Sequence, residues 1–242
     1  MTQPPLVQAA LNGSRRREEH PALPLTSWDL ARAATEAVEA GAGDIHIHVR
    51  DASGEESLAA VDVARAVDAL RAAVPGTPVS LSTGAWIVRD TEHRRRLVGE
   101  WTQRPDAAAV NFHEDGAESL AELLFTLGMA VDAGLSTPKA AERLVTSGVG
   151  PRCRRVILEP ASQDLAAARE AARRIEAVLE HAGLTVPRQL HGLDHTAWPL
   201  LADSAAKGYE IRIGFEDTLI LPDGSMAASN AVLVAEACWT LR

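Results

Sequence analysis

One short stretch shows how this chain is built: Asp44-Ile45-His46-Ile47-His48-Val49-Arg50-Asp51. Its apolar residues alternate with histidine, which is the pattern of a buried β-strand that ends where the charged Arg50-Asp51 pair begins. Successive side chains on a strand point to opposite faces, so His46 and His48 should share one face, roughly 7 Å apart at the backbone. The other face then carries only isoleucine and valine.

Two imidazoles at this spacing can bind one metal ion, with nitrogen–zinc bonds of about 2.0–2.1 Å. The alternative is that His46 and His48 lie on the polar face of an ordinary half-exposed strand. The charged pair directly after the strand favours a metal site, because it marks the point where the strand opens into a loop. A His-x-His pair still needs a third ligand from elsewhere in the chain.

The same strand-then-helix unit repeats on both sides of this stretch. Apolar runs alternate with alanine-rich helical runs, and we expect eight strand–helix pairs. The strands are predicted at 6–13, 44–49, 78–83, 107–112, 129–135, 155–159, 189–193 and 210–215. The helices are predicted at 25–40, 57–74, 90–101, 117–127, 136–147, 162–182, 196–207 and 225–239.

This strict alternation predicts a closed (β/α)8 barrel, the TIM-barrel fold of the α/β class, with residues 1–242 forming a single domain. An open, doubly wound sheet is the structural alternative. It is disfavoured because no Gly-x-Gly-x-x-Gly motif follows the first predicted strand.

Composition narrows the classes of function. The hydrophobic fraction of 46% supports a large core, and the net charge of −9 argues against nucleic acid or an anionic membrane as a partner. Cys153 and Cys238 have neither zinc-type nor redox-type spacing, which is typical of reduced thiols in a cytoplasmic protein. The first residues carry no basic segment followed by an apolar run, so we expect no signal peptide. The sequence has no apolar run that approaches the roughly 18 residues of a membrane span.

Polar side chains gather where the predicted strands end. A barrel places its active site at the carboxyl ends of its strands, and a buried charge without a partner is costly. So many polar residues at one rim of otherwise apolar strands therefore predict a site. These residues are Asn12, His46, His48, Ser82, Thr83, Gly84, Asn111, His113, Asp132, Glu159, His191, Asp194, Arg212, Glu216 and Asp217.

The last predicted strand supplies the missing metal ligand. It ends with Arg212-Ile213-Gly214-Phe215-Glu216-Asp217, in which Arg212 and Glu216 share a face. Closure of the barrel brings this strand beside the first and near the second, so Glu216 can complete a site of two histidines and one carboxylate. Asp217 is then a candidate base, with Arg212 as its electrostatic partner. Taken alone, the Glu216-Asp217 pair would also fit a solvated loop.

Substrate contacts are expected at the same rim. Ser82-Thr83-Gly84 offers a hydroxyl and backbone amides that suit a small carboxylate, or it is simply the turn that ends the strand. Asn12 and Asn111 are further candidates for substrate binding. Trp86 either walls the pocket or belongs to the core.

The remaining polar residues of the rim have less specific expectations. Asp132 and Glu159 could hold arginines, or could orient the metal-binding histidines through their free ring nitrogens. The histidines to which we assign no fixed role are His113, His191 and His195.

These segments together resemble the β-keto acid cleavage enzyme family, of which this chain would be a short member. The most specific resemblance is the pair of motifs His46-x-His48-x-Arg50-Asp51 and Arg212-x-Gly214-x-Glu216-Asp217. The supporting segments follow in the family's order: Leu11-Asn12-Gly13, His20-Pro21, Leu23-Pro24-Leu25-Thr26, Ala40-Gly41-Ala42, Leu81-Ser82-Thr83-Gly84, Gly224 and Ser229-Asn230-Ala231.

The resemblance implies a zinc-dependent (β/α)8 barrel that condenses a small β-keto acid with acetyl-CoA, giving acetoacetate and a new acyl-CoA. The residues that match the family's zinc ligands are His46, His48 and Glu216. Ser82 matches a residue that binds the substrate carboxylate, and Arg212 with Asp217 matches the pair that removes the α-proton. The implied mechanism is a retro-Claisen reaction, in which zinc polarises the keto oxygen and a carbanion attacks the thioester.

Several departures from the family's pattern leave the substrate side chain open. The first loop has Asn12-Gly13-Ser14-Arg15 where Thr-Gly is usual, and Asp132 stands where many members have glutamate. The segment 191–195 also differs from the common pattern. Residues Arg15, Arg16 and Arg17 could meet CoA phosphates or could form a solvated basic loop. We also expect a homo-oligomer.

Two other functions share part of this pattern. A metal-dependent hydrolase of the amidohydrolase type also begins with His-x-His in a barrel, but normally on the first strand and with a metal-bridging lysine. Here the pair falls on the second strand, and Lys139 and Lys207 fall in predicted helices. A non-catalytic metal-binding barrel is the other alternative. Zinc is the preferred ion, although nickel, cobalt or iron could occupy the same ligands.

Overall fold

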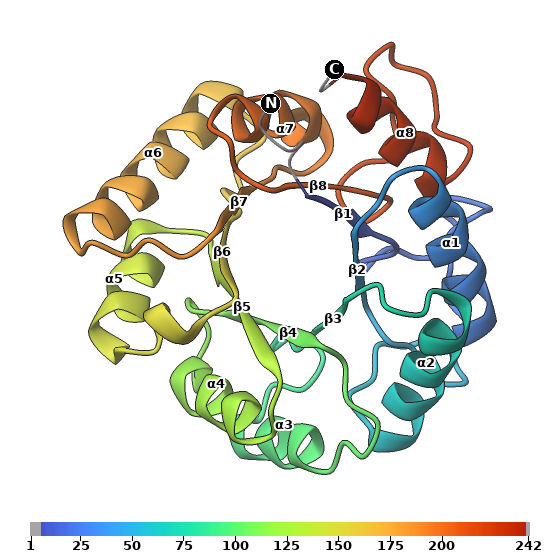
Figure 1. Cartoon of the computed structure of the whole chain (residues 1–242), viewed down its shortest axis with the longest axis horizontal. Helices are drawn as coiled ribbons and strands as arrows, with labels where there is room; N and C mark the ends of the chain where they lie inside the picture. Colours follow the sequence, from blue (N-terminus) through green and yellow to red (C-terminus); the bar gives the residue numbers. More distant parts are fainter. Residues whose placement is uncertain (1–5, 241–242) are drawn as a thin grey trace.

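The structure, a computed structural model, describes residues 6–240. A ring of strands forms the inner wall of a barrel, and the helices surround it (Figure 1). The strands are β1 (Val7–Ala10), β2 (Asp44–Ile47), β3 (Val79–Ser82), β4 (Ala107–Asn111), β5 (Ala130–Leu135), β6 (Arg155–Leu158), β7 (Arg188–Leu190) and β8 (Ile211–Ile213). The helices are α1 (Ser27–Glu39), α2 (Ala60–Ala73), α3 (Thr91–Gly99), α4 (Ala117–Thr126), α5 (Pro138–Ser147), α6 (Leu165–His181), α7 (Ala197–Ala206) and α8 (Asn230–Thr240), with short 3-10 turns η1 (Gly150–Arg152) and η2 (Asp194–Thr196).

Neighbouring strands run parallel in the order β7-β6-β5-β4-β3-β2-β1-β8. Pairing of β8 with β1 brings the last strand of the chain beside the first (Figure 1). At the seam between β7 and β8, Gln189 forms a parallel bridge with Glu210, whose N–H donates to the Arg188 carbonyl at 2.9 Å. The barrel is therefore nearly closed, and the predicted (β/α)8 fold is confirmed.

The alternation of strands and helices follows the prediction, but several elements are shorter than predicted. β1 ends at Ala10. Beyond this residue, the side chain of Asn12 takes the place of backbone pairing. Asn12 Oδ1 accepts the His48 N–H, and Asn12 Nδ2 donates to the His48 carbonyl, both at 2.8 Å. At the other end of the chain, α8 begins at Asn230 rather than at 225, after a loop closed by a bridge between Ile220 and Met226.

Local sequence signals set the ends of individual helices. The Thr26 hydroxyl accepts the Asp29 N–H at 3.1 Å while the Asp29 carboxylate accepts the Thr26 N–H at 3.1 Å, so α1 starts with a capping box. Thr137 caps α5 before Pro138, and Gly148 ends this helix with a φ of +74°. Both helices therefore begin and end within two residues of the predicted positions.

The interior of the barrel also contains charged side chains toward the amino-terminal ends of its strands. Asp44 and Asp132 are fully buried there. Arg154 pairs with Asp44 at 3.0 Å and donates to both Asp132 oxygens at 2.8 and 2.5 Å, and Arg155 also binds Asp44. TIM-barrel interiors are usually filled by branched apolar side chains. The expectation that polar residues lie only at the rim is therefore wrong: paired charges also fill the amino-terminal half of the interior.

The outward face of each strand packs against the helices. Ile45 and Ile47 of β2 and Ile213 of β8 are fully buried in this apolar layer, on the faces predicted for them. Within residues 6–240, none of the helices combines the length and the apolar character needed to cross a membrane.

Candidate active site and metal centre

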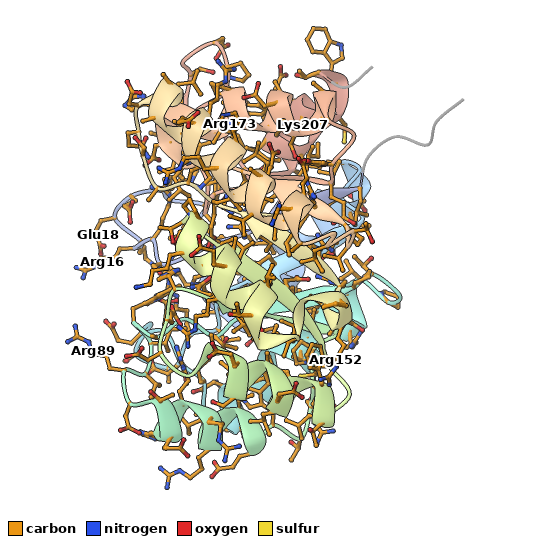
Figure 2. All side chains as sticks on the ribbon, turned by 90° about the vertical axis from the view of Figure 1, so that its left-hand side faces the viewer. Arg16, Glu18, Arg89, Arg152, Arg173 and Lys207 are labelled. Atoms are coloured by element: carbon orange, nitrogen blue, oxygen red, sulfur yellow. The ribbon has the colours of Figure 1, made fainter. Side chains whose placement is uncertain are left out.

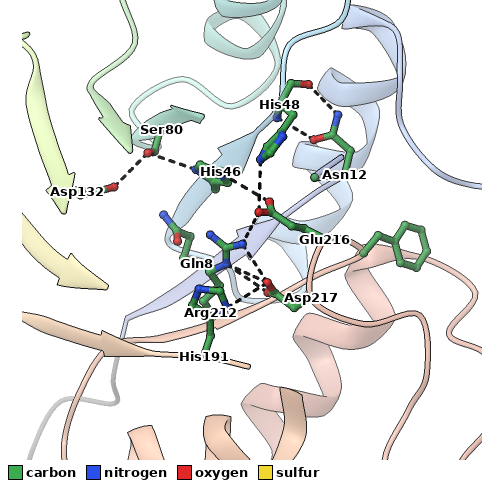
Figure 3. A network of polar contacts seen from close by, with 12 residues as sticks. Gln8, Asn12, His46, His48, Ser80, Asp132, His191, Arg212, Glu216 and Asp217 are labelled. Atoms are coloured by element: carbon green, nitrogen blue, oxygen red, sulfur yellow. Dashed lines mark hydrogen bonds and ion pairs between the residues drawn. The ribbon is translucent and has the colours of Figure 1, made fainter. Parts of the chain in front are cut away.

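His46 of β2, His48 directly after β2 and Glu216 after β8 meet at the carboxyl end of the barrel (Figure 3). His46 Nε2 lies 3.7 Å from Glu216 Oε2, and His48 Nε2 lies 3.4 Å from Glu216 Oε1. One ligand atom from each residue can be chosen so that all three lie within 4.8 Å of one another. The structure thus brings together the three side chains that the sequence suggested as metal ligands.

Glu216 reaches this position because two glycines leave room for it. Gly214 lies directly against the backbone of Ala10 in β1, where any Cβ would collide with the carbonyl group. Two residues later, the Glu216 N–H donates to the same Ala10 carbonyl at 3.1 Å. Gly13 has a φ of +57°, and a side chain there would meet the Cγ of Glu216. The glycine of the Arg-x-Gly-x-Glu-Asp motif therefore has a steric role.

The other ring nitrogen of each histidine already has a partner. His48 Nδ1 lies 2.5 Å from Glu56 Oε1, and the indole N–H of Trp86 donates to Glu56 Oε2 at 3.0 Å. His46 Nδ1 lies 3.4 Å from the Ser80 hydroxyl, which donates to Asp132 at 3.0 Å. Such contacts fix the orientation of metal-binding imidazoles. Both rings therefore keep Nε2 directed at Glu216.

Burial and neighbouring charges shift the pKa values of His46, His48 and Glu216 in different ways. Burial, only partly offset by the Glu216 carboxylate, lowers the pKa of His46 to about 3. Burial also opposes a charge on His48, but Glu216 and Glu56 outweigh it and raise its pKa to about 9. For Glu216, burial favours the neutral acid, but the cationic Arg212 and His48 hold its pKa well below the usual value. Glu216 therefore stays ionised, as a metal-binding carboxylate must.

The donor set fits a catalytic zinc ion. Glu216 Oε2 is buried and has no hydrogen-bond donor within the described part of the chain, although buried carboxylate oxygens are normally bonded. Two imidazole nitrogens and one carboxylate oxygen are a ligand set of catalytic zinc, which keeps a further position for water or substrate. His46, His48 and Glu216 are therefore suited to hold the metal that the family resemblance implies.

Arg212 and Asp217 form a buried ion pair beside these residues (Figure 3). Arg212 donates to Asp217 Oδ1 through Nη2 at 2.9 Å and Nε at 3.1 Å, and its Nη2 also lies 2.6 Å from Glu216 Oε1. Burial works against the charge on Arg212, but the two carboxylates raise its pKa above the ordinary value. Asp217 itself is 0% exposed.

His191 is a second neighbour of the Asp217 carboxylate. Its Nδ1 is 3.4 Å from Asp217 Oδ1, and its Nε2 is 3.6 Å from Glu159 Oε2. Burial and the nearby Arg212 disfavour the charged ring, but the two carboxylates outweigh them and raise the pKa of His191. His191, to which the sequence assigned no role, therefore connects Asp217 with the cavity described next.

A cavity of about 600 Å³ opens above the candidate metal ligands. His48, Glu216 and His191 line its floor, and Trp86 contributes to its wall. The indole of Trp86 stacks on the His48 ring with 6.0 Å between centroids and is 49% exposed. Of the two expectations for Trp86, a cavity wall is therefore the one that the structure supports.

Two of the five predicted substrate contacts, Asn111 and Ser82, keep a side-chain oxygen that no hydrogen bond within residues 6–240 occupies. Asn111 lines the cavity and donates from Nδ2 to Glu114 at 3.0 Å. Ser82 lies on the same inward face of β3 as Ser80, because residues two apart share a face. Its hydroxyl forms no hydrogen bond with any residue between 6 and 240, but Ser82 is buried and is not among the residues that line the cavity.

The other three predicted contacts have structural partners instead. Thr83 is buried and its hydroxyl donates to the Ala109 carbonyl at 2.6 Å. The Trp86 ring covers Gly84 so closely that a side chain there would collide with it. Asn12 is bonded to the backbone of His48, as described above. Contact of these residues with substrate stays a prediction.

Sequence reasoning missed Glu56, although a local signal was present. Asp51 Oδ1 accepts the N–H groups of Ser53 at 2.8 Å and of Glu55 at 3.1 Å, which turns the chain back on itself. An antiparallel bridge between Arg50 and Glu56 then brings the Glu56 side chain beside His48. The Asp51-Ala52-Ser53-Gly54 turn is recognisable from its residue types, and it indicates that the chain reverses there.

The amidohydrolase alternative requires a metal-bridging lysine. Lys139 lies in α5, and Lys207 follows α7 and binds Glu176 at 2.7 Å. Neither lysine lines the cavity at His48 and Glu216. The paired histidines lie at the carboxyl end of the second strand, with His46 in β2 and His48 directly after it.

Comparison with known proteins gives a consistent assignment. A sequence model of the beta-keto acid cleavage enzyme family matches residues 4–147 and 121–242. The 3-keto-5-aminohexanoate cleavage enzyme of Acetoanaerobium sticklandii is 24% identical over 253 residues, covering 95% of this chain and 88% of that protein. The 3-oxoadipate:acetyl-CoA acetyltransferase of Cupriavidus necator is 34% identical over 111 residues, covering 46% of this chain and 38% of that protein.

Among solved structures, the apo structure of ObcA is similar with a TM-score of 0.70 and 17% identity. The alignment covers 91% of this chain, which spans only 62% of the ObcA chain. At this level of identity the likeness shows a shared fold. The family match, in contrast, extends over almost the whole sequence and includes the segments that carry His46, His48 and Glu216. This chain belongs to the β-keto acid cleavage enzyme family.

Proposed function

We propose that the protein is a zinc-dependent β-keto acid cleavage enzyme with acetyl-CoA as its co-substrate. In the balanced reaction, R–CO–CH2–COO⁻ and CH3–CO–S-CoA give CH3–CO–CH2–COO⁻ and R–CO–S-CoA. Family membership supports cleavage of a β-keto acid. The partial match to an acetyl-CoA acetyltransferase supports the choice of thioester.

One observation carries this proposal: His46, His48 and Glu216 converge at the floor of a cavity, directly beside the buried Arg212–Asp217 pair. A purely structural zinc site is usually closed by four protein ligands. Here the group contains three candidate ligands, and two of them line the cavity, so a small substrate can approach the metal position.

The chemistry that zinc supplies in such a site is polarisation of a carbonyl oxygen, which acidifies the neighbouring C–H bond. We assign the substrate carboxylate to the free hydroxyl of Ser82. Asp217 is assigned as the final acceptor of the α-proton, with Arg212 as its ion-pair partner at 2.9 Å. Because Asp217 is fully buried, His191, which lines the cavity 3.4 Å from it, is placed to carry this proton between substrate and Asp217.

The test uses zinc-loaded protein, a panel of small β-keto acids and acetyl-CoA labelled with ¹³C in both acetyl carbons. The proposal requires the label to appear in acetoacetate, while the new acyl-CoA carries the unlabelled acyl group of the keto acid. Glu216→Gln, which removes a metal-binding charge, is the inactive control. Cleavage of the keto acid without acetyl-CoA would favour a hydrolase, and absence of turnover with the whole panel would favour a non-catalytic metal-binding barrel.

A further inference from the structure

A second cavity, of about 850 Å³, lies beside the active site. It is formed by the loop after β1 (residues 14–18), the segment that enters α1 (25–27), the loop after β2 (50–56) and one residue of α2. The chain as a whole has a net charge of −9, yet arginines gather in these walls. They are Arg15, Arg16, Arg17, Arg50 and Arg65.

Two of these arginines hold the loop in place. Arg15 donates from Nε to the Phe215 carbonyl at 2.5 Å and pairs with Asp194 at 2.7 Å. Arg50 donates from Nη2 to the carbonyls of Gly13 at 2.5 Å and Arg15 at 3.1 Å. These bonds tie the loop after β1 to both β2 and β8. The arginines that follow Arg15 are therefore presented by an ordered backbone.

Arg16 and Arg17 have no such structural role. Both are exposed, and within residues 6–240 the Arg16 guanidinium makes no ion pair within 4.0 Å. Arg17 reaches only Asp29, at 4.0 Å. Figure 2 shows Arg16 projecting from the same end of the molecule as Arg89, away from the barrel. Two guanidinium groups are thus available to an anionic ligand at the edge of this cavity.

Five arginines and four acidic residues line this cavity, so the acidic residues do not cancel the charge fully. Asp51 already accepts hydrogen bonds from the Ser53 hydroxyl and N–H, and Glu56 is bonded to His48 and Trp86. The other two acidic residues in the walls are exposed. Guanidinium groups bind phosphate through paired, charge-assisted hydrogen bonds. A ligand with several phosphate oxygens therefore suits this cavity better than a single carboxylate.

The two cavities are neighbours, since Ser14 and Arg15 line both of them. We propose, on the basis of the proposed function, that Arg16 and Arg17 bind phosphate groups of the acyl-CoA while its thioester lies in the active-site cavity. The part of the acyl-CoA between its phosphates and its thioester then passes over Ser14 and Arg15. The arginine loop is thereby a binding site for the nucleotide end of the thioester.

The experiment compares the double variant Arg16→Ala/Arg17→Ala with Arg89→Ala. Arg89 is an exposed arginine at the same end of the barrel but outside both cavities, so it controls for general charge effects. Calorimetry with CoA should show a Kd at least about ten-fold higher for the double variant and a change below about two-fold for Arg89→Ala. The KM for acetyl-CoA should rise with the Kd, whereas the KM for the phosphate-free thioester acetyl-N-acetylcysteamine should not change.

The outcomes separate this site from the proposed reaction. An unchanged Kd for CoA in a double variant that still turns over would overturn the arginine site and leave the reaction standing. CoA binding that depends on both arginines, in a protein that does not cleave β-keto acids, would support the site and count against the reaction. Wild-type protein that neither binds CoA nor turns over would overturn both. Equal thermal midpoints for the three proteins would show that folding is not the cause of any difference.

Discussion

At the scale of single residues, the site depends on Nδ1 of His46 and of His48. This is the ring nitrogen that does not face Glu216. Glu56 engages Nδ1 of His48, and Ser80 links Nδ1 of His46 to the buried Asp132. Each imidazole therefore has one bonded nitrogen and one nitrogen directed at the proposed metal position. These contacts distinguish a prepared site from two histidines that merely share a face of a strand.

Removal of Glu56 should therefore weaken metal binding without removing a ligand. We expect Glu56→Ala to lower zinc affinity by about 10–100-fold, because the His48 ring loses the contact that orients it. The adjacent, exposed Glu55 makes a matched control, and Glu55→Ala should bind zinc as the wild type does. Competition with a chromogenic chelator measures both affinities. Equal zinc affinity in the two variants would show that Glu56 does not orient His48.

The proton-transfer residues should behave in the opposite way. Asp217→Asn and His191→Gln are each expected to retain zinc but to lower kcat by at least about 100-fold, because neither side chain belongs to the metal-binding group. Elemental analysis and steady-state kinetics on the same preparations test this. Near-normal turnover of Asp217→Asn would remove Asp217 from the role of base, and near-normal turnover of His191→Gln would remove the histidine from the proton path.

At the scale of elements, the contact between β8 and β1 decides where Glu216 lies. Both strands are short, and the pairing between them is continued by the bond from the Glu216 N–H to the Ala10 carbonyl. Gly214 allows this approach because it has no side chain facing β1. Similarly, the side chain of Asn12 extends the pairing between β1 and β2 by bonding to the backbone of His48. The backbone pairing of β1 therefore ends before the apolar run in its sequence does.

A methyl group at Gly214 should separate these two strands. We expect Gly214→Ala to lower the free energy of unfolding by about 1–3 kcal/mol and to reduce zinc retention, because the added Cβ overlaps the Ala10 backbone. Gly99 in α3 has no heavy atom closer than 4.0 Å to the position of an added Cβ, so Gly99→Ala should leave stability unchanged or slightly raised. Urea unfolding compares the variants, and a Gly214→Ala protein as stable and as zinc-rich as Gly99→Ala would contradict the steric argument.

At the scale of the whole molecule, the barrel is held by an apolar layer outside the strands and by paired charges inside them. Asp44, Asp132, Arg154 and Arg155 form ion pairs with one another, so each buried charge has a partner of opposite sign. The same network reaches the metal-binding residues through Ser80. The amino-terminal half of the interior therefore supports the site as well as the fold.

The labelling rate of the Cys153 thiol, which lies beside this interior, can show whether the native barrel opens. Cys153 is buried, and its burial, together with the charge of Asp132, raises the pKa of the thiol to about 12. Only about 10⁻⁴ of it is then thiolate at pH 8, whereas an unfolded cysteine ionises near its ordinary pKa of about 8.5. Iodoacetamide labelling of Cys153, followed by peptide mass spectrometry, should be slow in buffer and fast above the urea midpoint. Rapid labelling of the native protein would show that this region opens without global unfolding.

Local patterns along the sequence were sufficient to predict the fold and the meeting of His46, His48 and Glu216. Alternating strand and helix signals predicted the barrel, because each signal depends on neighbours a few residues away. His46, His48 and Glu216 were recognisable because barrel topology places their strand ends together.

Only the tertiary structure decided what the remaining polar residues do. It showed that Asn12 and Thr83 bond to backbone groups, that Glu56 returns to His48, and that His191 lies between Asp217 and the cavity. Hydrogen bonds and burial depend on atoms brought together from distant parts of the chain. A residue's type and position in the sequence limit which contacts it can make, but the packed barrel selects among them.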